Sequence, residues 1–410
     1  MKIAVIGGGA AGFFAAITAK VHDPHAELIL FEKTRKPLSK VKISGGGRCN
    51  VTNGSDSIRE LVQAYPRGGK VLKKLLPRFN NRHIMEWFQN RGIGLVTEAD
   101  GRVFPDTHRS STIVNCLMEE FHKVDARLEL GKGVQRIHPR SDGFQLGFRR
   151  GEVQTFDRVI VASGGSPERK GLEWLERSGH SIESPVPSLF TFNMPEERIT
   201  ELAGISIEEA EAKVQGSAVK AKGALLITHW GMSGPAILKL SAFGARELYD
   251  RAYRFQLQVN WVQEKNEERV REGLRRTAES HSAKQLRNRS PFGLPQRLWE
   301  FLLERAEFPR DKPWGELGKK SLHKLVDLLT RDVYEVRGKS TFKEEFVTCG
   351  GVALDQVRTA NMESKVHPGL FFAGEVLNID AITGGYNFQA AWTTGYIAGL
   401  SSVRKGGGNS

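Results

Sequence analysis

Residues 2–12 read KIAVIGGGAAG, an apolar run that opens directly into the pattern Gly7-x-Gly9-x-x-Gly12. Helix-like apolar residues follow through residue 19, and a second apolar run over residues 27–31 ends at Glu32. Strand, glycine turn, helix, second strand and terminal acid are the parts of a dinucleotide-binding βαβ unit. The sequence therefore predicts a Rossmann-like α/β fold that binds an adenine dinucleotide.

The three glycines are expected to meet different requirements. Gly7 permits a tight turn, Gly9 lets a pyrophosphate approach the backbone, and Gly12 lets helix and strand pack closely. The N-terminus of the following helix offers unpaired N–H groups and a positive dipole to the phosphates. Glu32 is expected to accept hydrogen bonds from the adenosine ribose.

Length and composition indicate an intracellular enzyme of more than one domain. A chain of 410 residues is expected to form about two to three domains. No apolar run approaches the roughly 20 residues of a membrane span, and the N-terminal run has no cleavage site, so we expect a cytoplasmic protein without a membrane partner. Cys49, Cys116 and Cys349 are odd in number and widely separated, which argues against a disulfide framework and against a metal site.

Positive charge is concentrated in two stretches of the chain. Residues 33–91 carry fourteen Lys or Arg against three acids, and residues 265–343 carry nineteen against twelve, within a total net charge of +13. Such segregation can attract a polyanion. The alternative is a solvated basic face plus a few residues that hold cofactor phosphates. The predicted RNA contacts in the first stretch are Lys70, Lys73, Lys74 and Arg78.

Three later segments are typical of the same fold. Residues 158–165 (RVIVASGG) are expected to form a buried parallel strand that ends in small residues, where a cofactor can approach the backbone. Residues 369–375 (GLFFAGE) repeat this pattern and end in Glu375, an acid placed to bind the ribityl hydroxyls or, through water, the pyrophosphate of FAD. Residues 384–387 (GGYN) open an Ala-rich helix whose N-terminus is expected over the flavin pyrimidine edge, where its dipole favours the anionic reduced flavin.

Six segments together resemble one known family of flavoproteins. They are SGGGRCNVTN (44–53), GRVFP (101–105), THWGMSGP (228–235), GGV (350–352), GE (374–375) and GGYNFQ (384–389). From residue 1 to about residue 400 the chain is similar to the HI0933-like family, also labelled BaiN-like or aminoacetone-oxidase-like. The resemblance implies a glutathione-reductase-like FAD domain interrupted by a small β-barrel and a helical insert. It also implies one of several substrates, because some members are linked to reduction of rRNA uridine to dihydrouridine, others to enone reduction on steroids or to amine oxidation.

On this basis we expect three domains. The FAD-binding domain is discontinuous, over residues 1–187 and 345–410. The β-barrel covers residues 188–263 and 325–344, and the helical insert covers residues 264–324. The predicted cofactor contacts are Gly7, Gly9, Ala10, Ala11, Gly12, Glu32, Lys33, Lys40, Ser44, Gly45, Gly46, Gly47, Arg48, Cys49, Asn50, Val134, Ala162, Gly164, Gly165, Gly374, Glu375, Gly385, Tyr386, Asn387 and Phe388.

The glycine-rich loop that begins at Ser44 raises two questions of chemistry. Arg48 can pair a phosphate oxygen bidentately, and Lys40 or Lys42 can add a point charge. Cys49 is either a small packing residue or a proton donor beside the flavin for reduction of a C=C bond.

Two further side chains are candidates for acting on or contacting the substrate. His229 is a second candidate donor, although the segment around it also reads as a strand-to-helix turn with Ser233 as the helix cap. Arg102 is a candidate substrate contact.

A second glycine unit and a CxxC pair are absent from the sequence, so a disulfide reductase is not expected. NAD(P)H, as the reductant, is expected to bind only transiently. The sequence favours an FAD-dependent oxidoreductase that reduces a conjugated C=C by hydride transfer from flavin N5, with uridine in ribosomal RNA as the leading substrate. A small-molecule enone reductase or amine oxidase is the alternative, and a flavin-binding protein without turnover is a third class. No DNA partner is expected, and the oligomeric state is left open.

Overall fold

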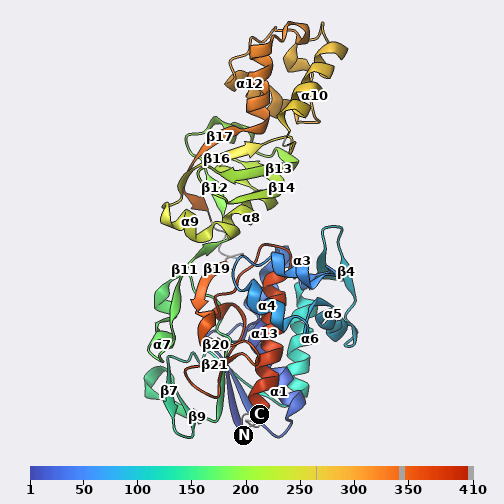
Figure 1. The fold of residues 1–410 in the computed structure, drawn as a ribbon. Helices are drawn as coiled ribbons and strands as arrows, with labels where there is room; N and C mark the ends of the chain where they lie inside the picture. Colours follow the sequence, from blue (N-terminus) through green and yellow to red (C-terminus); the bar gives the residue numbers. More distant parts are fainter. Residues whose placement is uncertain (265, 341–346, 405–410) are drawn as a thin grey trace. The chain divides into compact units, whose positions relative to one another are not determined.

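The computed structural model describes residues 1–264, 266–340 and 347–404. It divides into two compact units, one formed by Met1–Ser188 and Lys343–Ser410 and the other by Leu189–Phe342 (Figure 1). Among the described residues, no helix combines the length and the apolar character that crossing a bilayer requires.

The first unit is built on a seven-stranded sheet of order β20-β21-β22-β10-β1-β2-β6. Five neighbouring strands are parallel: β1 (Lys2–Ile6), β2 (Glu27–Glu32), β6 (Arg127–Leu130), β10 (Arg158–Val161) and β22 (Leu370–Phe372). An antiparallel edge is formed by β20 (Val357–Arg358) and β21 (Glu363–Ser364). The central strands are apolar runs because both faces of a parallel sheet are covered, and Ile3, Ala4 and Val5 are fully buried.

Two helices pack against each other in this unit, α1 (Ala10–His22) and α13 (Tyr386–Val403) (Figure 1). The approach is close because glycines line the contact. A Cβ at Gly395 would lie 2.7 Å from the carbonyl oxygen of Ala11, and one at Gly399 would lie 2.4 Å from that of Ala15. The glycines of α13 therefore allow close packing against α1. Because β22 pairs with β10, the C-terminal part of the chain belongs to the same sheet and unit as the N-terminal strands.

Shorter elements complete the first unit. The helices are α2 (Ser39–Gly47), α3 (Ile58–Gln63), α4 (Gly69–Leu75), α5 (Asn81–Gln89), α6 (Ser110–Lys123) and α7 (Glu173–Glu176). The small sheets are β3-β5-β4 (Thr52–Asn53, Arg102–Pro105, Leu95–Thr97), β7-β8-β9 (Arg136–Arg140, Gly143–Gly147, Val153–Phe156) and β11-β19 (Ile182–Ser188, Val347–Val352). Single turns of 3-10 helix include η6 (Leu354–Gln356) and η7 (Gly374–Val376).

The second unit contains a seven-stranded antiparallel sheet of order β17-β16-β13-β14-β15-β12-β18. Its strands are β12 (Thr191–Asn193), β13 (Ser206–Val214), β14 (Lys220–Thr228), β15 (Gly231–Ser233), β16 (Arg254–Asn260), β17 (Asp332–Arg337) and β18 (Lys339–Ser340). The helices are α8 (Pro235–Phe243), α9 (Ala245–Asp250), α10 (Glu267–Ser280), α11 (Gln296–Arg305) and α12 (Lys319–Thr330). Sheet and helices share one hydrophobic core.

The seven strands occupy the place of the predicted small β-barrel, but their sheet is not a closed barrel. Within the described part of the chain, the hydrogen-bonded order ends at β17 on one side and at the two-residue strand β18 on the other. β17 and β18 are joined by Gly338 (φ +118°), whose N–H donates to the carbonyl of Tyr253 (2.9 Å) and whose carbonyl accepts from the N–H of Asn193 (3.0 Å). The boundary drawn between a barrel domain and a helical insert stays a prediction.

Candidate functional site

The glycine turn after β1 is held by close packing. Gly7 has φ +115°, and its N–H donates to the carbonyl of Phe31 (2.8 Å). A Cβ at Gly7 would lie 2.2 Å from the carbonyl oxygen of Ala162, and a Cβ at Gly12 would lie 1.9 Å from that of Gly7. These two positions admit only glycine because a side chain would collide with the backbone.

Gly9 differs from both of these glycines. It is the N-cap of α1 with an ordinary φ of −93°, and a Cβ there would meet nothing within 4 Å. The same open space surrounds Gly46, Gly47 and Gly164. Ala10 and Ala11 form the first turn of α1, where backbone N–H groups lack helical acceptors. Open space beside a helix N-terminus fits a diphosphate, so the residues present suit a dinucleotide.

Glu32 is held by the backbone of this turn. Its carboxylate accepts from the N–H of Gly8 (2.8 Å) and from that of Thr34 (2.8 Å). Each carboxylate oxygen can accept a further bond, so a ribose hydroxyl still has an acceptor here. Lys33 is exposed, and Val134 is half-buried directly after Gly133, whose Cβ position lies 3.0 Å from Cβ of Lys33.

The glycine-rich loop follows a left-handed path at the end of α2. After Ser44, which has an extended ψ of 152°, Gly45, Gly46 and Gly47 all have positive φ. Cys49 also has positive φ (+63°), and its N–H donates to the carbonyl of Ser44 (3.0 Å). The Cys49 side chain is completely buried, and burial raises its pKa to about 12. These properties favour the packing alternative over a proton donor, because a fully buried thiol does not reach a ligand surface.

The two arginines near this loop are paired with acids. Arg48 bonds Glu98 (2.7 Å) and stacks over the ring of Phe104 (3.9 Å to the centroid). Arg102 pairs with Glu98 (2.8 Å) and with Asp100 (2.7 Å). We predicted that Arg48 pairs with a phosphate and that Arg102 contacts the substrate, whereas in the structure both arginines are paired with acidic side chains. Both roles stay predictions that require the ion pairs to exchange.

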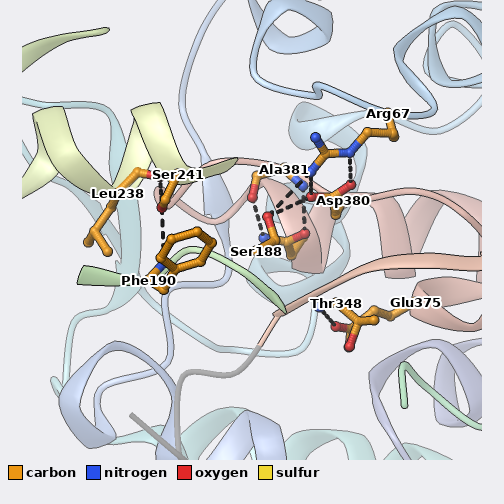
Figure 2. A network of polar contacts seen from close by, with 10 residues as sticks. Arg67, Ser188, Phe190, Leu238, Ser241, Thr348, Glu375, Asp380 and Ala381 are labelled. Carbon is orange, nitrogen blue, oxygen red and sulfur yellow. Dashed lines mark hydrogen bonds and ion pairs between the residues drawn. The ribbon is translucent and has the colours of Figure 1, made fainter. Parts of the chain in front are cut away.

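Glu375 lies where β22 ends, in the acid position that the glycine pattern predicts. Its carboxylate pairs with Lys40 (2.7 Å) and accepts from the N–H of Thr348 (3.0 Å), a contact that Figure 2 shows. A Cβ at Gly165 would lie 2.9 Å from this carboxylate, and one at Gly374 would lie 2.8 Å from Cβ of Ala11. The carboxyl ends of β1, β10 and β22 therefore meet around one space, which is where ligands bind in open parallel sheets.

The N-terminus of α13 is fixed by contacts with distant parts of the unit. Gly385 caps the helix with φ +87°, and its N–H donates to the side-chain carbonyl of Asn50 (2.9 Å) when that amide is oriented to satisfy all its neighbours. The hydroxyl of Tyr65 donates to the carbonyl of Tyr386 (2.6 Å), and the amide of Asn387 bonds both backbone groups of Ala381. Phe388 stacks on Trp392 inside the unit (5.8 Å between centroids).

One buried ionic network was not predicted from the sequence. Asp380 is 0% exposed and accepts from Nε of Arg67 (2.6 Å) and from Oγ of Ser188 (2.8 Å), as Figure 2 shows. Arg67 precedes α4, and Asp380 lies in the loop before α13. The sequence did offer a sign of this network. Asp380 is the one charged residue in the mostly apolar stretch LNIDAI (377–382), and a charged side chain that becomes buried requires a partner.

His229 lies in the second unit, between β14 and β15. Its ring is exposed and packs edge-on against Trp230 (4.4 Å between centroids). The proton-donor role stays a prediction. The predicted helix cap at Ser233 is wrong, because Ser233 belongs to β15 and Gly234 is the N-cap before Pro235.

The predicted RNA-contacting residues lie on and after α4. Lys70, Lys73 and Lys74 are exposed, and their ammonium groups make no ion pair with the described residues. Arg78 is exposed and donates to the carbonyl of Ala360. The three lysines therefore present uncompensated positive charge on one short helix.

A groove of about 610 Å³ runs beside α4. Its lining residues are Val62, Tyr65, Pro66, Gly68, Gly69, Lys70, Val71, Leu354 and Asp355. Among the residues that the structure describes, no group of three or more His, Cys, Asp or Glu side chains is arranged to hold a metal ion.

The sheet, the glycine turns and the acid after β22 define a Rossmann-type flavoprotein, an FAD-dependent oxidoreductase. Residues 1–401 match the model of the HI0933-like protein Rossmann domain, so the chain belongs to the HI0933-like family. FAD suits the glycine cradle, and Gly9, Glu32, Gly164 and Glu375 are the residues that would hold it.

Two curated relatives are similar over nearly their whole length. The chain is 27% identical to the 3-dehydro-bile acid delta(4,6)-reductase of Clostridium scindens, covering 98% of this chain and 99% of the relative. It is also 27% identical to the ribosomal RNA dihydrouridine synthase of Escherichia coli, covering 96% of this chain and 95% of the relative. Among solved structures, a flavocytochrome c3 fumarate reductase in an open conformation matches with a TM-score of 0.51 at 16% identity, covering 98% of this chain and 78% of that one. That similarity shows the fold alone.

Proposed function

We propose that this protein reduces a conjugated C=C bond and that its substrate is uridine in ribosomal RNA, which becomes dihydrouridine. Relatives from Escherichia coli and Haemophilus influenzae, both 27% identical, are named ribosomal RNA dihydrouridine synthases. The relative from Clostridium scindens is named as a reductase of a bile acid, so reduction is common to these names.

One structural observation supports RNA as the substrate. The segment that leads into the lysine-bearing helix α4 is attached to the loop and helix start at α13. Tyr65 bonds the carbonyl of Tyr386, Arg67 pairs with Asp380, and the N–H of Ile382 donates to the carbonyl of Ala64 (3.0 Å). A polyanion attracted to Lys70, Lys73 and Lys74 would therefore be held beside the helix start that is expected at the flavin.

The proposed reaction adds a hydride to one carbon and a proton to the other carbon of the uracil C5=C6 bond. When bound, reduced FAD would supply the hydride, water would supply the proton, and a reduced nicotinamide dinucleotide would restore the two electrons to the flavin. The first turn of α13 contributes backbone N–H groups and a positive dipole, which stabilise negative charge at its end. Asn50, Tyr65 and Asn387 keep this turn in place through the bonds described above.

A small-molecule enone reductase is the second candidate. The name of the Clostridium scindens relative favours it, and so does the mostly apolar lining of the groove beside α4. A steroid-like enone would use this apolar surface without needing the lysines.

Dihydrouridine mapping of ribosomal RNA tests the proposal. RNA from cells that lack the gene should lose dihydrouridine at a defined position, and a plasmid copy should restore it. A plasmid copy of the Gly9→Val variant, which should not retain FAD, is the control and should not restore it. Identical dihydrouridine profiles with and without the gene would rule out the RNA substrate and leave the enone reductase as the leading function.

A further inference from the structure

We infer that the groove beside α4 binds an unstacked nucleotide of single-stranded RNA, adjacent to the uridine that is reduced. This inference rests on the proposed RNA substrate and specifies the form of RNA that the protein accepts.

The groove has two walls with different chemistry. One wall consists of the end of α3 and the start of α4, from Val62 to Val71, and the other is Leu354 and Asp355 in η6. Farther along, Arg78, which follows α4, donates to the carbonyl of Ala360, which follows β20. The groove is therefore bounded by fixed elements of one unit.

The groove lies close to the start of α13. Tyr65 lines it, and the hydroxyl of this tyrosine donates to the carbonyl of Tyr386, the first residue of α13. An RNA strand that occupies the groove thus passes next to the first turn of α13, where the edge of the flavin is expected. This position suits a neighbour of the reacting base.

The distribution of polar and apolar groups matches a nucleotide. Val62, Pro66, Val71 and Leu354 offer apolar surface for the face of a base. Lys70 lies at the groove, and Lys73 and Lys74 are exposed farther along the same helix, where they can neutralise backbone phosphates. Proteins that bind single strands combine a positively charged groove for the backbone with aromatic side chains on which bases stack, and Tyr65 is the aromatic residue among those that line this groove. Asp355, on the opposite wall, can accept a hydrogen bond from a base N–H.

The volume and the lining of the groove favour single-stranded RNA over duplex RNA. A volume of about 610 Å³ lies in the roughly 300–1,000 Å³ range of small-ligand pockets. Duplex RNA is recognised across its shallow minor groove and does not enter such a pocket. Enzymes that act on a base also require that base outside the stack. The groove would hold the strand in this unstacked form.

Filling the groove tests the inference. In Val71→Trp and, from the other wall, Leu354→Trp, a bulky uncharged side chain takes the space of the base. We expect each variant to bind a uridine-containing single strand roughly tenfold more weakly, since contacts to a base face are lost. The dependence of affinity on salt should stay as in the parent, because no phosphate contact is removed. Fluorescence anisotropy at several salt concentrations measures both quantities.

Matched controls separate the groove from general effects. Val153, an exposed valine of β9 (54% exposed), is replaced by Trp in the control variant, which should bind like the parent. FAD content reports folding of each variant, and two variants on separate walls guard against a local packing defect. The parent should also prefer the single strand over a hairpin that sequesters the same uridine.

The possible results distinguish this inference from the proposed function. Parental affinity in both groove variants, or equal binding of strand and hairpin by the parent, would overturn the inference while RNA reduction still stands. The inference would also be overturned if both groove variants bound RNA like the parent but lost the ability to reduce an enone that the parent reduces. That result would assign the groove to a small molecule. Failure of the parent to bind RNA at all, together with unchanged dihydrouridine in the deletion strain, would overturn the proposed function itself.

Discussion

Gly7, Gly9 and Gly12 belong to one sequence motif but meet two different physical requirements. At Gly7 and Gly12 a Cβ would collide with backbone of the same unit, so these residues serve the fold. At Gly9 a Cβ would meet open space and the backbone has an ordinary φ, so the fold does not require glycine. We therefore expect the requirement for glycine at this position to come from a bound dinucleotide.

Replacing Gly9 by Val is therefore expected to leave a folded protein without FAD. The β-branched side chain would occupy the space of the pyrophosphate. Absorbance of the purified protein near the flavin bands, with FAD identified after denaturation, measures the loss. Gly318→Val is the matched control, since Gly318 also caps a helix with negative φ and open space around its Cβ position, and this variant should stay yellow.

The Gly12→Val variant should instead fail to fold, because its Cβ would lie 1.9 Å from the carbonyl oxygen of Gly7. Full FAD retention in the Gly9→Val variant would contradict the assignment of this turn to the cofactor.

His180 gives a prediction for pH. It is 3% exposed, with Oγ of Ser178 3.0 Å from Nδ1 and Oγ of Ser364 2.7 Å from Nε2. Burial, and secondarily the nearby His367, lowers its pKa from 6.5 to about 4. The unfolded chain therefore binds the proton more readily, so stability is intact above about pH 6.5 and is lost as the pH falls toward 4.

Between pH 7 and pH 5 this one group should cost about 2 kcal/mol of stability. Urea titrations followed by flavin fluorescence report the unit that contains His180. The His180→Gln variant should be less stable at pH 7 but should show a smaller loss between pH 7 and pH 5. An equal loss in both proteins would show that His180 does not carry this pH dependence.

At the scale of elements, α4 combines a buried face with an exposed cationic face. Leu72 and Leu75 are buried, whereas Lys70, Lys73 and Lys74 are exposed. The apolar residues attach the helix to the unit, so its lysines can be changed without loss of the core. Arg78 differs from them because its guanidinium already bonds the carbonyl of Ala360.

Changing the three lysines of α4 to Gln should weaken binding of single-stranded RNA and reduce its salt dependence. Each phosphate contact on a single strand contributes a slope of about −0.7 in log K against log salt, so the slope should fall in magnitude by about 2. FAD content should remain that of the parent. Lys170, Lys220 and Lys365 are exposed lysines outside α4 and form the control triple.

An unchanged affinity and slope in the α4 variant would show that these lysines form only a solvated face. The small-molecule reductase would then be favoured over RNA reduction.

For the whole molecule, the architecture bears on the source of electrons. The described residues contain one parallel sheet with a glycine turn, and the other large sheet is antiparallel. A dedicated nicotinamide domain of the Rossmann type would require a second parallel unit. We therefore expect NADH and NADPH to bind weakly and transiently in the absence of substrate.

Calorimetric titration of the FAD-loaded protein with NADH and NADPH measures this affinity. Neither should show a dissociation constant in the low micromolar range, while an excess of NADH or NADPH should still reduce and so bleach the flavin under anaerobic conditions. Tight binding of either nucleotide would reveal a dedicated site that this architecture does not predict.

The sequence alone determined the Rossmann unit, since its signals are local. Strand, turn and helix of residues 2–19 follow directly from an apolar run and three spaced glycines, and the family membership follows from motifs spread over the chain. The acid at Glu375 and the helix start at Tyr386 were predictable for the same reason, because each directly follows a short, recognisable segment.

Only the tertiary structure decided which charges meet. Arg48 pairs with Glu98, and Arg67 pairs with Asp380 over 313 positions of sequence, so neither partnership leaves a local pattern. Whether the predicted small β-barrel closes was not decided by the sequence for a related reason, because closure depends on how the edge strands pair across the fold. The groove beside α4 likewise requires η6 to lie against a helix nearly 300 residues earlier in the chain. Local conformation is encoded in neighbouring residues, whereas ion pairs, sheet edges and cavities depend on the packing of distant ones.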